Sequence, residues 1–314
     1  MSSHAAVTGR RGATPPGRPG LRLNRRRSLE LWIFLIPGAA FFALFFLYPL
    51  VYGFHLATSD VNAGTFITGQ ADFVGFGNFA TVFESPLLGK AIVNTLLISL
   101  AAVASQLVLG LAIALLFNRT FPGSKWMPSL ILLPWLLPSV VVATIWKWLL
   151  AGDGPVNGIL GSLGLPTPIW LADPFWAMPV VIAVAVWSGI PYWSTILGAA
   201  LKQVPVEQLE AAQLDGAGAW RRLISIVVPT ILPVISVLVV MGVVYTLLIV
   251  DLILVLTSGG PANATVTLGI LAYRTAFQEF EFGVAAAYGA VLLVISLTFA
   301  LFYVLLSRRQ EKDA

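Results

Sequence analysis

The sequence contains no cysteine and little charge. The absence of cysteine excludes disulfide frameworks, thiolate zinc sites and cysteine nucleophiles. Charged residues make up 10% and apolar residues 58% of the 314 residues, whereas an ordinary soluble domain is about 25% charged. The mean hydropathy is +0.90. This balance argues against a water-soluble fold and predicts several helices of membrane-spanning length.

Common motifs of catalysis and nucleotide binding are also missing. No G-x-x-x-x-G-K-[ST] loop occurs, so nothing in the chain cradles nucleotide phosphates in that manner, and G-x-S-x-G is absent. The two histidines, His4 and His55, lie far apart in the sequence. We therefore expect no catalytic residues, no metal site and no cofactor held by this chain.

Six long apolar segments predict an all-α integral membrane protein. In lipid the backbone must satisfy its own hydrogen bonds, so apolar runs of this length are expected to form helices. The first run is too long for the apolar region of a signal peptide, which is about 7–15 residues. The expected spans are 31–54, 91–117, 127–150, 177–201, 231–256 and 284–307.

The basic residues gather on one side of these spans. Fifteen of the 18 Lys and Arg fall in the N-terminal tail, the loops after the second and fourth spans, and the C-terminal end. Only Lys90, Lys147 and Arg274 fall on the other side. The positive-inside rule places the basic side, and hence both termini, in the cytoplasm of a plasma membrane.

The segments outside the spans differ in character. Residues 1–29 are rich in Arg, Pro and Gly and are expected to be a disordered, basic cytoplasmic tail, with nucleic-acid binding as the less favoured alternative. Residues 308–314 form a short cytoplasmic tail. Residues 55–90 and 151–176 hold few or no bases. They are expected to form short interfacial helices and turns that face an extracytoplasmic partner.

The cytoplasmic segment 203–229 predicts a helical hairpin. A helix over 205–215 would begin at Pro205 and end at Gly216, which can adopt the positive φ that ends helices. A second helix begins near Ala219, since apolar residues then recur at helical spacing. Pro229 and Pro233 allow a bend before the fifth span.

This hairpin carries a spaced motif. Glu210-Ala211-Ala212 is followed after three residues by Gly216, and after nine more by Ile226-Val227-Val228-Pro229. The spacing resembles the EAA motif of permease subunits of binding-protein-dependent ABC importers, with Val228 in place of the usual Leu. In that family the loop is a coupling helix that docks on the ATPase. The resemblance implies ATPase contact at Glu210, Ala211, Ala212, Asp215, Gly216 and Ala217.

Further segments are similar to the carbohydrate branch of that family, over roughly residues 30–307. They are FVGFGNF (73–79), AIVNT (91–95), the run 187–217, TSGGPANAT (257–265) and YRTAFQEFEFGVAAA (273–287). The resemblance implies the type I permease fold, six transmembrane helices with a cytoplasmic coupling hairpin. It also implies an ABC ATPase dimer that uses the ATP, a second permease subunit in a heterodimer, an extracytoplasmic solute-binding protein, and a sugar or polyol substrate.

Candidates for the solute pathway are polar and aromatic residues within the spans. Ionisable residues inside a membrane are functional candidates, and Asp251 is the acid within the predicted spans; its place near the outer end also suits simple exposure to water. Five residues around Pro191 combine aromatic faces with hydroxyls, although Tyr and Trp also mark membrane interfaces. These five are Trp187, Ser188, Tyr192, Trp193 and Ser194.

Other polar residues in the spans have plainer interpretations. Lys147 suits a snorkelling end residue, and Asn94 and Gln106 suit hydrogen bonds between helices. The scarcity of bases in the spans favours a neutral solute. Three alternatives remain. An ion-driven secondary transporter is disfavoured because only one acid lies in the spans, and a membrane enzyme because no catalytic constellation is visible. A structural membrane protein is disfavoured because it would need no coupling hairpin.

Overall fold

The computed structural model describes residues 35–119, 121–124 and 126–313, and for residues 304 and 306–313 the backbone only. The expected tail over 1–29 and the start of the first span lie outside these residues. The chain divides into two compact units, residues 1–52 and 53–314. Among the described residues the secondary structure is helical, with only two isolated β-bridges. The all-α prediction is confirmed.

The first unit contributes most of one apolar helix, Leu35–Ala57. The helix includes a π-helical turn, η1 (Ala43–Leu47), and continues as α2 (Tyr48–Ala57). The wide turn comes directly before Pro49, whose ring would otherwise clash with the carbonyl four residues earlier. The phenylalanines of this helix, such as Phe42, are more than half exposed, as expected of a side that faces lipid.

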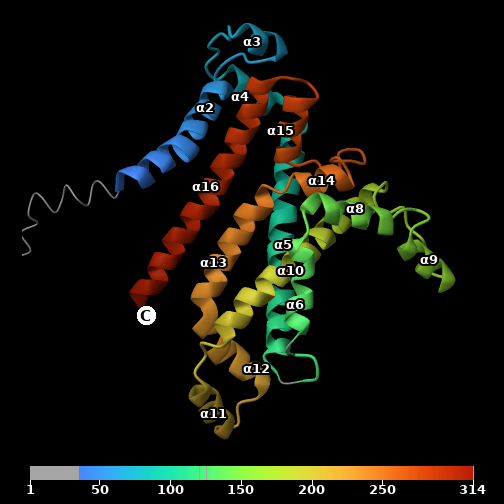
Figure 1. Cartoon of the computed structure of the whole chain (residues 1–314), viewed down its shortest axis with the longest axis vertical. Coiled ribbons are helices and arrows are strands. Elements are labelled where there is room, and N and C mark those ends of the chain that lie inside the picture. Colours follow the sequence, from blue (N-terminus) through green and yellow to red (C-terminus); the bar gives the residue numbers. More distant parts are fainter. Residues whose placement is uncertain (1–34, 120, 125, 314) are drawn as a thin grey trace, which may run out of the picture. The chain divides into compact units, whose positions relative to one another are not determined.

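The second unit is built on four long helices, α5 (Leu88–Phe117), α10 (Pro174–Leu201), α13 (Val228–Leu247) and α16 (Phe282–Asp313). Short helices lie at the two ends of this group of long helices (Figure 1). One end carries α3 (Ala63–Thr68), α4 (Gly77–Glu84) and α15 (Leu268–Phe277); the other carries α11 (Val206–Leu214) and α12 (Ala219–Arg222). The remaining helices are α6 (Met127–Ile131), α7 (Leu133–Leu136), α8 (Ser139–Leu149), α9 (Pro155–Ser162) and α14 (Asp251–Leu256).

The described residues contain five helices that are long and apolar enough to cross a membrane, and six if one bent pair counts as a span. That pair covers the expected span over 127–150 and is broken in its middle, where Met127–Leu136 and Ser139–Leu149 meet at 97°. Pro138 explains the break. A residue before proline avoids the helical conformation, and Leu137 is extended, with ψ 139°.

The expected fifth span, 231–256, differs from the structure at both ends. Its helix begins in the hairpin at Ala219, passes through a π-helical turn, η2 (Leu223–Val227), and ends at Leu247. Pro229 does not end this helix, because the wide turn before the proline accommodates its ring, as it does before Pro49. Residues 251–256 form the separate helix α14. Asp251 lies in its first turn, where a negative charge is favourable.

Glycines allow α5, α10 and α13 to pack closely around Trp193, whose side chain is 2% exposed. A Cβ at Gly110 would lie 2.8 Å from the Cβ of Trp193, and a Cβ at Gly242 would lie 2.6 Å from its Cζ2. Ser99 and Thr246 join α5 to α13 through a hydroxyl hydrogen bond of 2.7 Å. Small residues and buried hydroxyls are the usual means of helix association in lipid.

The loop between α14 and α15 is held on the start of α5. Asn94 Nδ2 donates to the carbonyls of Ala264 (3.0 Å) and Val266 (2.8 Å). Arg274 donates to the Ser258 carbonyl (2.6 Å) and to Asn263 Oδ1 (3.0 Å). The AIVNT and TSGGPANAT segments therefore contact each other, and Asn94 ties a loop to a helix rather than two spans together.

Candidate functional site

The first candidate site is the hairpin formed by α11 and α12. Helix α11 ends as predicted, since Gly216 has φ +77° and the Ala217 amide donates to the Ala212 carbonyl at 2.8 Å. This is the hydrogen-bond pattern of a left-handed helix cap. Arg222 Nη1 donates to Gln213 Oε1 at 2.8 Å and so joins the two arms of the hairpin.

The predicted contact residues all lie at the end of α11 and in the turn that follows it. Glu210, Ala211, Asp215 and Gly216 are exposed, and Ala212 and Ala217 are half-buried. Sequence reasoning missed Leu214, which is 90% exposed. A leucine so placed gains free energy only when another surface covers it, and large exposed apolar groups mark interaction sites.

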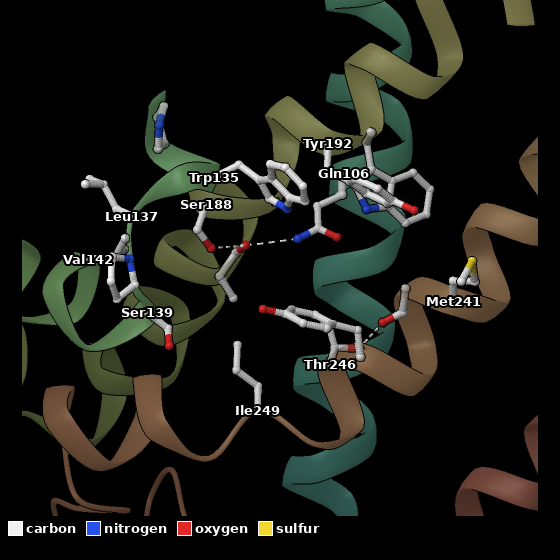
Figure 2. A pocket seen from close by; sticks show the side chains of 17 residues that line it. Gln106, Trp135, Leu137, Ser139, Val142, Ser188, Tyr192, Met241, Thr246 and Ile249 are labelled. Carbon is white, nitrogen blue, oxygen red and sulfur yellow. Dashed lines mark hydrogen bonds between the residues drawn. The ribbon is translucent and has the colours of Figure 1, made fainter. Parts of the chain in front are cut away.

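The second candidate site is a cavity of about 450 Å³ within the second unit. It lies where α7 meets α8, beside α10, α5 and the end of α13 (Figure 2). The two breaks described above, at Leu137–Pro138 and after Leu247, both lie next to it. A cavity beside discontinuous helices is typical of solute sites in transporters.

The structure brings together three of the six predicted pathway residues. Ser188, Tyr192 and Trp193 line the cavity. Trp187 and Ser194 do not: Trp187 packs edge-on against Trp146, with ring centroids 5.6 Å apart, and Ser194 lines a different cavity of about 470 Å³. On a helix only one face of consecutive residues can reach a given cavity, so the cluster around Pro191 is divided between surfaces.

Asp251 also does not line the cavity, but it contacts a residue that does. Ser139 Oγ donates a hydrogen bond to Asp251 Oδ2, and Ser139 is part of the cavity wall. Lys147 Nζ donates to the Val255 carbonyl at 3.1 Å. These two contacts fasten α8 alongside α14, so the helices that follow the two breaks are joined to each other.

Sequence reasoning missed two prominent lining residues, Trp135 and Tyr245, and favoured a hydrogen bond between helices for a third, Gln106. Trp135 stacks on Tyr192, with ring centroids 5.6 Å apart and an interplanar angle of 21°. Gln106 Nε2 donates to the Ala185 carbonyl at 2.9 Å, which fixes the amide at the cavity wall (Figure 2). The hydrogen bond between α5 and α10 that the sequence predicted for Gln106 is confirmed, whereas no local pattern indicated Trp135 or Tyr245.

The lining is aromatic and polar but uncharged. Among the described residues that line the cavity, none is Asp, Glu, Lys, Arg or His. Hydroxyl and amide groups can exchange hydrogen bonds with a solute, and the aromatic rings offer flat apolar faces. The described residues contain no group of three or more His, Cys, Asp or Glu that could hold a metal ion. The arrangement can bind an uncharged polar solute.

Comparisons with known proteins address both sites. A family model described as "Binding-protein-dependent transport system inner membrane component" matches residues 106–312, which include the hairpin and the cavity. The sulfoquinovosyl glycerol transport system permease protein SmoG of Agrobacterium fabrum is 30% identical over 89% of this chain and 90% of its own length. The trehalose/maltose transport system permease protein MalF of Thermococcus litoralis is 28% identical over 91% and 96%.

The fold is likewise similar to a solved structure. A chain in the crystal structure of a bacterial ABC transporter that imports the acidic polysaccharide alginate superimposes with a TM-score of 0.77. The two chains are 27% identical, and the match covers 90% of this chain and 96% of the other. The similarity therefore extends over nearly all of both chains, beyond the hairpin motif alone.

Proposed function

Because the chain belongs to the binding-protein-dependent transport system inner membrane components, the integral membrane permeases of ABC importers, we propose that it forms half of the translocation pathway for an uncharged sugar or polyol. The chain is a transport subunit and not an enzyme. It has the type I permease fold. Membership in this family argues against the two alternative interpretations of the chain as an ion-driven transporter or as a membrane enzyme.

The observation that carries the choice of solute is the uncharged, aromatic cavity. A sugar ring presents apolar C–H faces and a rim of hydroxyls. The stacked pair Trp135 and Tyr192 matches the faces, and the Gln106 amide and Ser188 hydroxyl match the rim. The names of the relatives, which concern sulfoquinovosyl glycerol, trehalose and maltose, support a carbohydrate.

Coupling to ATP is proposed to run through the hairpin. A separate ABC ATPase dimer uses the ATP, and this chain holds no cofactor. Leu214 would fill an apolar cleft on the ATPase, since it is the large apolar side chain that the hairpin exposes most. The carboxylates of Glu210 and Asp215, which no described residue pairs, would face basic groups at the rim of that cleft.

A second permease subunit would complete the pathway, and an extracytoplasmic binding protein would deliver the solute. The distribution of Lys and Arg supports an orientation with the hairpin and both termini in the cytoplasm. The end that carries α3, α4 and α15 would then face the binding protein. Movement of the hairpin would reach the cavity through Ala219–Leu247, because this one helix begins in the hairpin and ends beside Tyr245.

Uptake by the reconstituted importer tests this proposal. Trp135→Ala should lower uptake of a neutral sugar by about tenfold, the effect of losing an aromatic contact and its packing area. Trp148→Ala is the matched control, because Trp148 is also exposed, at 64%, but lies outside the cavity lining. Equal uptake by both variants, or preferred uptake of an acidic saccharide, would contradict the proposed cavity.

A further inference from the structure

A groove lies at the hairpin end of the second unit, away from the solute cavity. Its volume is about 380 Å³. It lies between the end of α5, the end of α10 and the hairpin. We propose that this groove binds an anionic membrane lipid, with the phosphate on Arg119 and Arg222 and an acyl chain along the apolar wall.

Two guanidinium groups give the groove its charge. Arg119 and Arg222 line it, and no Asp or Glu is among its described lining residues. Arg222 is held in place by the neutral Gln213, which satisfies one donor without cancelling the charge. Neither arginine has an ion pair with any described residue. Guanidinium groups bind phosphate oxygens in a fixed fork.

The rest of the wall is apolar. Leu115, Leu201 and Leu223 line the groove, and Leu201 is buried while the other two are half-buried. An inorganic anion would leave this apolar surface in water. A ligand that is anionic at one end and apolar along its length would cover both parts, and a phospholipid has this form.

The groove also lies at the level where the bilayer headgroups are expected. Three membrane-length helices begin or end beside it, at Phe117, Leu201 and Ala219. Trp220, also in the lining, is 72% exposed, and exposed tryptophans gather at membrane interfaces. This placement favours a membrane lipid over a soluble phosphate compound.

Lipid retention by the full importer complex provides the test. The complex would be exchanged into nanodiscs of phosphatidylcholine with a minor fraction of phosphatidylglycerol, and retained phosphatidylglycerol measured by native mass spectrometry. Each of R119Q and R222Q should lower the affinity about fivefold, and the double variant about 25-fold, as expected for one and two charges near an anionic lipid. Arg221→Gln is the control, because Arg221 is exposed on the same turn but does not line the groove.

A further variant separates charge from folding of the hairpin. Gln213→Ala removes the hydrogen bond to Arg222 but keeps both charges, so it should retain phosphatidylglycerol. If R222Q and Q213A lost lipid equally, the hairpin and not the charge would be responsible, and the proposal would be wrong.

Three other results would overturn the assignment. An equal loss in R221Q would show a general effect of surface charge. Displacement of the lipid by soluble glycerol phosphate, or by inorganic phosphate, would show that the groove binds a soluble anion. Loss of ATPase from R119Q and R222Q with unchanged lipid would show that the two arginines belong to a protein interface.

Discussion

The helix over Ala219–Leu247 has very different surroundings at its two ends. At its start, in the hairpin, the surface carries both signs of charge, with Arg222 in the groove and the exposed Leu214 close by in sequence. At its other end Tyr245 lines a cavity whose described wall has no charge. At 1.5 Å per residue the helix spans roughly 40 Å. One continuous helix thus joins a surface suited to charged macromolecular partners to a cavity suited to a neutral solute.

The surroundings also differ in how they are built. The hairpin is made from about twenty consecutive residues, and its cap at Gly216 depends on the backbone alone. The cavity is assembled from residues between Gln106 and Ile249, brought together by α5, α7, α8, α10 and α13. A single substitution can therefore disable the hairpin locally, whereas the cavity depends on the packing of the whole helix group.

Chemical labelling should give the largest difference, between the hairpin and the end of the second unit that carries α3. The chain has no native cysteine, so Leu214→Cys and Ile67→Cys, at positions 90% and 84% exposed, each introduce a single reactive thiol. In intact cells a membrane-impermeant maleimide should label Ile67→Cys and leave Leu214→Cys unlabelled until the cells are permeabilised. The reverse pattern would place the hairpin outside the cell and refute its proposed contact with the ATPase.

Gly216→Val should have the next largest effect, a loss of ATPase binding by the hairpin. The position has φ +77° and open space around it, so the cost comes from the backbone and is about 1–2 kcal/mol or more. We expect roughly a tenfold loss of ATPase co-purification, while the helices still insert. Gly218→Ala is the control, since Gly218 has φ −65° and open space; an equal loss there would argue against the cap.

An alanine at Gly242 should affect the cavity side instead. Its Cβ would lie 2.6 Å from the Trp193 ring and 3.2 Å from Val103 Cγ2, and overpacking of this kind costs about 1–3 kcal/mol. The variant should show a lower Tm and slower uptake but unchanged ATPase attachment. Gly198→Ala, where the nearest contact is 4.0 Å, should behave as wild type. Loss of ATPase binding in Gly242→Ala would contradict the separation of ATPase attachment, at the hairpin, from solute passage, at the cavity.

The smallest effect on uptake is expected at the hydrogen bond between Ser139 of α8 and Asp251 of α14. Ser139→Ala removes the hydrogen bond to Asp251 and should cost about 1 kcal/mol, measured as a modest fall in uptake. Asp251→Asn keeps an acceptor and should cost less. If Asp251→Asn lowered uptake more than Ser139→Ala, the charge of Asp251 would act on the solute itself, as the sequence first suggested.

Structural features that depend on a run of consecutive residues can be predicted from the sequence. The helical character follows from apolar runs, and the helix before Gly216 follows from a local pattern that packing does not override. The breaks were harder. Before Pro138 the helix ends at Leu136, whereas Pro229 and Pro233 do not interrupt theirs. A π-helical turn before Pro229 accommodates the ring of that proline. The same residue type gives opposite outcomes, and the local sequence does not distinguish them.

The cavity shows a second limit of sequence-based prediction, which concerns the face of a helix on which a residue lies. Ser188, Tyr192 and Trp193 were identified because they are adjacent in sequence, and Trp187 and Ser194 were grouped with them for the same reason, although they face elsewhere. Trp135 and Tyr245 became candidates only when α7 and α13 were placed beside α10. A single sequence gives the period of a helix but not the direction in which each face points.

The most direct test of the account measures ATP hydrolysis in proteoliposomes that contain the complete importer and its sugar-loaded binding protein. Wild type should hydrolyse ATP faster when the neutral sugar is present. Leu214→Ser should leave hydrolysis by the isolated ATPase unchanged but abolish both the stimulation and the uptake. Full stimulation and uptake in Leu214→Ser, or a wild-type chain that purifies with no ATPase bound, would contradict the claim that the hairpin couples the ATPase to the cavity.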